Sequence, residues 1–179
     1  MNNVDGPHGA EPVELRQQRV GPADLAEFGG APLSAADCVF TGCDLSVMHF
    51  GVVKGCQFVD SKLRGTVFSK HIMATTFNQC ALNECRFRMT VLRDVMFEHC
   101  HLLDNDFYGS ELERVAFPDS EFAGVGFDAC QLAEVDLSEA SSLLVGDPRT
   151  LIGATIDETQ VPAIGLRLAT LSGINVLER

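Results

Sequence analysis

The chain has 179 residues, of which 46% are hydrophobic and 21% are charged, a balance typical of a folded domain rather than a disordered one. Thirteen Lys and Arg residues stand against 25 Asp and Glu residues, and the formal net charge of −12 argues against a protein that binds DNA or an anionic membrane through its overall field. No apolar run is long enough to span a bilayer, and residues 1–5 have neither the basic nor the apolar part of a signal peptide, so we expect a cytoplasmic protein.

The first segment, residues 1–33, shows no repeat. Gly and Pro recur in it at positions 6–7, 9, 12, 21–22 and 29–30, which predicts a flexible N-terminal lead. One helical turn at residues 22–28 would cover the first part of the fold that follows. Such a cover prevents edge-to-edge polymerisation when that fold ends in an open sheet edge.

A five-residue period dominates the second segment, residues 34–145. Every fifth residue from Phe77 to Leu137 is Phe or Leu, thirteen in succession, and an earlier block from Phe58 to Met73 has the same period in a shifted register. The residue two positions before each of these is almost always small or β-branched. A period of five fits neither a helix nor a flat strand. A unit with one large and one small inward residue, and three outward ones, describes one side of a square coil of about 20 residues whose turns stack like a parallel sheet.

This pattern resembles the pentapeptide-repeat family, and the resemblance covers about residues 36–140. It implies an all-β solenoid, a right-handed quadrilateral β-helix. Its length corresponds to about five coils. The register breaks at residues 46–57 and 73–77 are where we expect the coil to be irregular.

The cysteines and histidines fit this pattern without a metal site. Each of the seven cysteines lies two positions before a Phe or Leu, which indicates core-filling free thiols rather than a disulfide or metal framework: positions 38, 43, 56, 80, 85, 100 and 130. His99 and His101 flank Cys100 and could share a weak surface metal site, although a solvated edge is the more common outcome for two such residues. No catalytic or phosphate-loop motif is present, so we expect neither a cofactor nor an enzyme.

The third segment, residues 146–179, predicts a short C-terminal α-helix. Residues 157–160 have the composition of a helix start, Pro162 is tolerated in the first turn, and Gly173 is a plausible stop. Its apolar face would consist of Val161, Ile164, Leu168 and Leu171. The helix either caps the last coil or joins two rods end to end. Residues 153–160, the helix and Gly173–Ile174 resemble the tail of the mycobacterial fluoroquinolone-resistance pentapeptide proteins, and that resemblance implies a homodimer through this tail.

Charge is segregated along the repeat. Residues 54–93 hold seven bases and two acids, whereas residues 98–139 hold eleven acids and one base. A surface charged only for solubility would intersperse the two signs. The acidic stretch spans about two coils, or roughly 10 Å of axis, over which duplex DNA would carry about six charges.

Three functions follow as hypotheses. The resemblance implies a DNA-mimicking protein that binds DNA gyrase or topoisomerase IV and modulates it or protects it from drugs; the chain has no long projecting loops, so the loop-less mycobacterial type is the nearer resemblance. The candidate contacts are Asp104, Asp106, Glu111, Glu113, Asp128 and Glu134. A passive scaffold with an unassigned protein partner is the second hypothesis. A small-ligand carrier or enzyme with a pocket at a register break is the third. None of the three calls for direct binding of nucleic acid or membrane.

Overall fold

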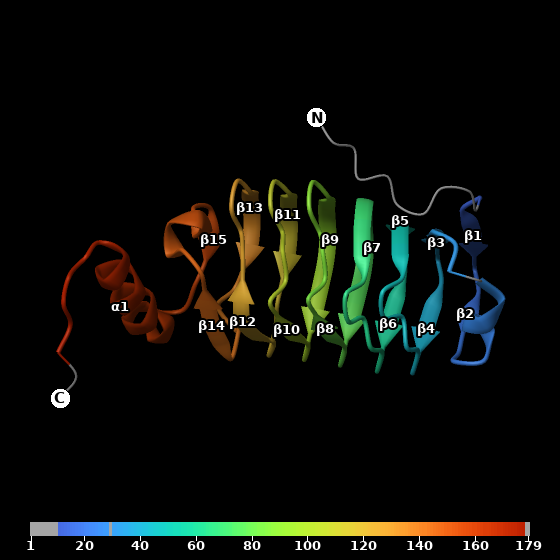
Figure 1. The fold of residues 1–179 in the computed structure, drawn as a ribbon, viewed down its shortest axis with the longest axis horizontal. Coiled ribbons are helices and arrows are strands. Elements are labelled where there is room, and N and C mark those ends of the chain that lie inside the picture. The colour runs from blue at the N-terminus through green and yellow to red at the C-terminus, as the bar shows by residue number, and fades with distance from the viewer. Residues whose placement is uncertain (1–10, 29, 178–179) are drawn as a thin grey trace.

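The computed structural model describes residues 11–28 and 30–177, and they form a single rod (Figure 1). The rod is a parallel β-solenoid of about seven turns that ends in one short helix. The longest ladder runs in the order β1 (Val13–Arg16), β3 (Leu33–Ala36), β5 (His49–Lys54), β7 (Val67–Asn78), β9 (Val91–Glu98), β11 (Glu111–Ala116), β13 (Gln131–Asp136) and β15 (Ala154–Thr155). The predicted all-β solenoid is therefore confirmed.

The remaining strands form the other walls. β2 (Arg19–Val20), β4 (Val39–Thr41) and β6 (Gln57–Val59) pair in that order and join β7, which is long enough to turn a corner and belong to two walls. A separate sheet consists of β8 (Ala81–Asn83), β10 (His101–Leu103), β12 (Glu121–Val125) and β14 (Ser142–Val145). All these pairings are parallel, so each strand lies on the strand one coil earlier.

The predicted count of five coils is too low, and the expected lead at residues 1–33 is wrong for its described part. Strand β1 pairs with β3 at an offset of 20 residues, so the solenoid begins at Val13, and β15 extends the ladder beyond residue 145. The Phe/Leu period does not extend to the added coils, because smaller residues such as Val20 and Ala35 occupy buried positions there. Residues 1–10 lie outside the described part of the chain, and the turn expected at residues 22–28 is present as the 3₁₀-helix η1 (Asp24–Phe28).

Two columns of stacked phenylalanine rings fill the solenoid. In one column neighbouring rings lie 4.7 to 5.0 Å apart, and its members are Phe40, Phe58, Phe77, Phe97 and Phe117. In the other the spacing is 4.5 to 5.4 Å, and its members are Phe50, Phe68, Phe87, Phe107 and Phe127. The columns meet edge to face, as between Phe87 and Phe97 at 6.1 Å and 89°. Stacking and edge contacts are the arrangements that aromatic quadrupoles favour, which explains why Phe outnumbers the other aromatic residues.

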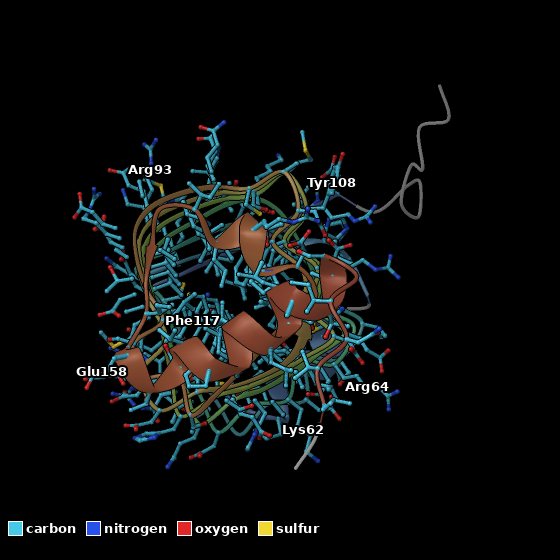
Figure 2. All side chains as sticks on the ribbon, turned by 90° about the vertical axis from the view of Figure 1, so that its left-hand side faces the viewer. Lys62, Arg64, Arg93, Tyr108, Phe117 and Glu158 are labelled. Atoms are coloured by element: carbon cyan, nitrogen blue, oxygen red, sulfur yellow. The ribbon has the colours of Figure 1, made fainter. Side chains whose placement is uncertain are left out.

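Viewed along the rod, Phe117 lies inside the ring of backbone, whereas Lys62, Arg64 and Arg93 project from its outer wall (Figure 2). The residue two places after most of the central Phe and Leu residues turns the corner with a positive φ, for example +53° at Asp94 and +53° at Arg114. Most of these corner residues are not glycine, so the coil accepts left-handed strain at its corners. The corners therefore place charged side chains at the outer edges of the rod.

The small inward positions are filled by thiols and hydroxyls. All seven cysteines are free, and six of them are buried while Cys130 is half-buried. Burial raises the pKa of Cys56 to about 11 and that of Cys85 to about 12. The Cys85 thiol donates to the Leu63 carbonyl at 2.7 Å. The cysteines pack as small core residues, and burial holds Cys56 and Cys85 in the unreactive thiol form.

The tail closes the C-terminal end. It contains two 3₁₀-helices, η2 (Pro148–Leu151) and η3 (Glu158–Gln160), followed by α1 (Val161–Leu171). Asp157 and Gln160 form a capping box ahead of α1. The Gln160 side-chain amide also donates to the Leu137 and Ala140 carbonyls at 2.9 and 3.0 Å, which fastens the tail to the last coil. Within the described residues no helix is both long and apolar enough to cross a membrane.

Candidate protein-binding surface

The 20-residue offset between coils brings the basic and acidic stretches into contact. Arg93 in β9 lies beside Glu113 in β11, and Arg93 Nε is 2.9 Å from Glu113 Oε2. The same offset pairs Arg64 with Glu84 at 2.9 Å and Arg114 with Asp94 at 2.6 Å. The segregation seen along the sequence is therefore partly neutralised where the two stretches meet.

Two of the six predicted acidic contacts are held by such pairs. Asp106 forms an ion pair with Arg88 and accepts the Tyr108 backbone N–H at 2.9 Å. Arg88 also lies 5.5 Å from the Tyr108 ring centroid, a cation–π distance. Glu113 is paired with Arg93 and also with Arg114. Both carboxylates are already bound within the rod and would have to exchange partners to reach another protein.

The other four predicted acids form no ion pair within the described residues. Glu111 lies on β11, on the same wall as Glu113. Glu134 lies one coil later, at a corner within β13, with a φ of +54°. Asp104 lies at another corner, with a φ of +53°. Asp128 lies on the wall of Asp106, one coil later. The structure thus spreads the predicted residues around the rod instead of collecting them on one wall.

An acidic surface lies near the C-terminal end of the rod. No Lys or Arg occurs between residues 115 and 148. We call its exposed carboxylates the acidic band, formed by Asp119, Glu121, Asp128, Glu134, Asp136 and Glu139. The six predicted contacts include Asp128 and Glu134 but omit the other four members of the band.

Within the described residues, the only basic side chains at ion-pair distance from the band are two histidines. His99 Nδ1 lies 3.8 Å from Asp119, and His101 Nδ1 lies 3.1 Å from Glu121. Each histidine faces an acid one coil later, and the described residues contain no group of three or more potential metal ligands. By contrast, a hydrogen bond from Arg114 holds the pKa of Asp94 below its usual range. The acidic band has no equivalent arginine.

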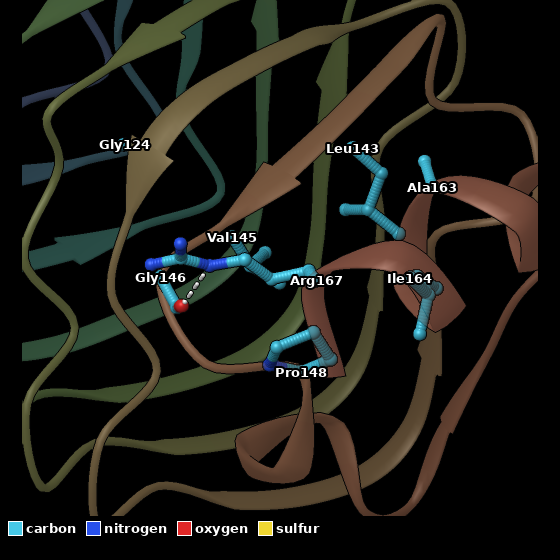
Figure 3. A pocket seen from close by; sticks show the side chains of 8 residues that line it. All are labelled: Gly124, Leu143, Val145, Gly146, Pro148, Ala163, Ile164 and Arg167. Carbon is cyan, nitrogen blue, oxygen red and sulfur yellow. Dashed lines mark hydrogen bonds between the residues drawn. The ribbon is translucent and has the colours of Figure 1, made fainter. Parts of the chain in front are cut away.

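The helix α1 lies next to this band and leaves much of its apolar surface exposed. Of the predicted face, Ile164 packs against the core and Leu168 is half-buried, while Val161 and Leu171 are 51% and 41% exposed. A cavity of about 320 Å³ separates the helix from β14, and Arg167 spans its mouth to donate to the Gly146 carbonyl at 2.9 Å (Figure 3). The helix is therefore an incomplete cap.

Comparison with known proteins identifies the repeat. Residues 52–127 match the sequence model of the pentapeptide repeat region. This part of the chain is a pentapeptide-repeat region. A comparison with curated proteins finds no match.

Among solved structures, the chain is similar to a trypsin-treated variant of QnrB1, a plasmid-mediated fluoroquinolone resistance protein, with 19% identity over 94% of this chain and 92% of that chain and a TM-score of 0.39. Full-length QnrB1 gives 17% identity over 89% of this chain and 99% of that chain, with a TM-score of 0.33. The pentapeptide-repeat protein Rfr23 from the cyanobacterium Cyanothece 51142 gives 13% identity over 82% and 86%, with a TM-score of 0.26.

Proposed function

We propose that this protein is a non-catalytic binding protein whose acidic band enters a basic, DNA-binding cleft of a type II topoisomerase, DNA gyrase or topoisomerase IV. The observation that carries the proposal is the band itself: six exposed acids within residues 119–139, with no Lys or Arg between residues 115 and 148. These residues make about one coil, which rises roughly 4.8 Å, and duplex DNA carries about three charges over that length. The band therefore exceeds DNA in linear charge density.

Such a surface would be guided into a basic cleft by long-range attraction, and its binding would weaken as salt screens that attraction. The choice of topoisomerase as the partner rests on the resemblance of the repeat and tail to the fluoroquinolone-resistance pentapeptide proteins. Modulation of the enzyme, and protection from drugs that act on it, are the proposed consequences.

The test is a gyrase supercoiling assay in which the purified protein is titrated with and without a quinolone. We expect inhibition that weakens about tenfold or more between 50 and 200 mM salt, as for a ligand that replaces DNA on a basic surface. The double variant Asp128→Asn/Glu134→Gln should lose potency. The matched control Glu84→Gln/Asp94→Asn removes the same number of charges from acids that have their own arginines.

Equal losses of potency in the two variants would show that inhibition depends only on net charge, and would refute a specific role for the acidic band. The absence of any effect on gyrase or topoisomerase IV would reject the topoisomerase and favour the scaffold hypothesis, for which an unbiased pull-down is the next experiment.

We further propose that α1 joins two rods end to end, so that two acidic bands flank the junction. The support is the exposed apolar surface at Val161 and Leu171, and that of Ile174 and Val176 after the helix, which are 60% and 50% exposed. Ile164 instead secures α1 to its own rod.

Light scattering tests the dimer. Val161→Glu/Leu171→Glu should give a monomer, whereas Leu166→Glu, which changes a 53% exposed residue on the opposite side of the helix, should not. A monomer in the unaltered protein would exclude the end-to-end rod.

A further inference from the structure

A shortened coil leaves a hollow in the wall near the N-terminal end of the rod. Leu33 pairs with Phe50 but Ala35 pairs with Val53, so the register shifts within β5, and it shifts again between Phe50 and Val52 on the β7 side. Gly51 lies at this irregularity. A Cβ on Gly51 would stand 3.2 Å from the Ser34 hydroxyl oxygen, so glycine keeps the hollow open.

The resulting cavity has a volume of about 400 Å³, within the range of small-ligand sites. Side chains from four successive strands of the ladder line it, among them Arg16, Ser34, Val52, Lys54 and Lys70. Pro12 and Ala36 add apolar surface. The cavity thus combines an apolar wall with basic side chains.

Its charge is opposite to that of the protein as a whole. Three cations, Arg16, Lys54 and Lys70, line the cavity with one carboxylate, Glu14, in a chain whose formal net charge is −12. Glu14 lies 3.0 Å from Arg16. Lys54 and Lys70 form no ion pair with any described residue, and the stem of Lys70 runs alongside Gly51, with its Cδ 3.9 Å from where a Cβ would stand. Two free ammonium groups are therefore available to an anion.

We propose that this cavity binds an organic polyphosphate of about the size of a nucleotide. The cations belong to β1, β5 and β7, so they are distributed over about 15 Å of the rod axis, which suits a row of phosphates better than a single one. Arg and Lys are the usual partners of phosphate oxygens. The Ser34 hydroxyl oxygen accepts the Val52 backbone N–H at 3.4 Å, and its own hydrogen is free to donate to a phosphate. The apolar wall would hold the organic part.

The test is isothermal titration of the full chain with ATP and, separately, with inorganic tripolyphosphate, at low salt and without divalent cations. We expect ATP to bind more tightly than tripolyphosphate because only ATP has a group for the apolar wall. Lys54→Ala/Lys70→Ala should weaken ATP binding tenfold or more. Gly51→Val should also weaken it, by filling the hollow without changing the charge.

Lys62→Ala is the matched control for Lys54→Ala alone, because Lys62 is exposed on a different wall, next to Asp44 and Ala81. The absence of binding up to about 1 mM ligand, a free energy weaker than about −4 kcal/mol, would overturn the proposal. Equal weakening of ATP binding by Lys62→Ala would show that only the overall basic field attracts the ligand, and this result would also overturn the proposal. Equal affinity for the two ligands would refute the contact with the apolar wall. These titrations contain no topoisomerase, so their outcome is independent of the proposed function.

Discussion

Replacing one ring of the phenylalanine stack by leucine should destabilise the solenoid by more than the loss of apolar surface predicts. Phe97 is fully buried, lies 4.7 Å from Phe77 and 5.0 Å from Phe117 in its column, and meets Phe87 edge-on at 6.1 Å. Leu occupies the equivalent position on neighbouring sides of the coil, so Phe97→Leu introduces a residue that fits the repeat. The substitution nevertheless removes three aromatic contacts. At about 0.5–1.5 kcal/mol for each such contact, we expect the free energy of unfolding to fall by about 3 kcal/mol.

Chemical denaturation followed by circular dichroism measures this change, with the slope of the transition compared between variants so that a loss of cooperativity is not read as a loss of stability. Phe28→Leu is the control, because Phe28 in η1 is 9% exposed and stacks on no other ring of the described residues. A swap between apolar residues of similar size costs less than about 1.5 kcal/mol. Equal destabilisation by Phe97→Leu and Phe28→Leu would show that ring stacking adds nothing to burial and would refute the reasoning.

Three further predictions concern corners, thiols and pH. Val47 is a β-branched residue with a φ of +56° and an 83% exposed side chain, so Val47→Gly should raise the free energy of unfolding by about 1 kcal/mol in a denaturation experiment; a fall would contradict corner strain. Ellman's reagent should modify the half-buried Cys130 first and the other cysteines only on unfolding, so a fast phase that survives in Cys130→Ala would be contrary evidence. Because Arg114 lowers the pKa of Asp94, the stabilisation from this pair is complete above the unfolded value of about 3.9 and is lost as the pH falls through the lower folded value. Thermal melts should therefore show Asp94→Asn to be less stable than the unaltered protein at pH 7, with a difference that shrinks as the pH falls below about 3.9, and a constant difference would exclude this linkage.

The five-residue period predicts the fold because each side of the coil repeats one environment, a buried pair of positions and an outward corner. The period does not predict the end coils, because their buried positions do not repeat the same environment. Leu15, Val20 and Ala35 occupy the buried positions of the first coils, and no run of large residues at a fixed spacing marks them. Residue type does not predict the corners either, since residues as different as Asp94 and Arg114 adopt the same positive φ. Their conformation is imposed by the stacking of the coils and not by local preference.

The charged surface could be predicted only in part. The basic and acidic stretches are visible in the sequence, and an offset of 20 residues would have paired Arg93 with Glu113. That offset does not hold across β3, β5 and β7, where the register shifts. The meeting of Arg16, Lys54 and Lys70 at one cavity depends on those shifts, so the residue spacing alone could not predict it.

The separation of the two proposed surfaces makes them independent. Lys54 lies on β5, and Glu134 lies on β13, four ladder steps away, which corresponds to about 19 Å along the rod. This is about twice the Debye length of roughly 10 Å at 0.1 M salt, so the charges of one surface are screened from the other. Lys54→Ala/Lys70→Ala should therefore leave any inhibition of gyrase unchanged, and Asp128→Asn/Glu134→Gln should leave ATP binding unchanged. A change of threefold or more in either cross-measurement would mean that the surfaces are coupled, and because screened charges cannot act over this distance, the coupling would have to pass through the stacked core.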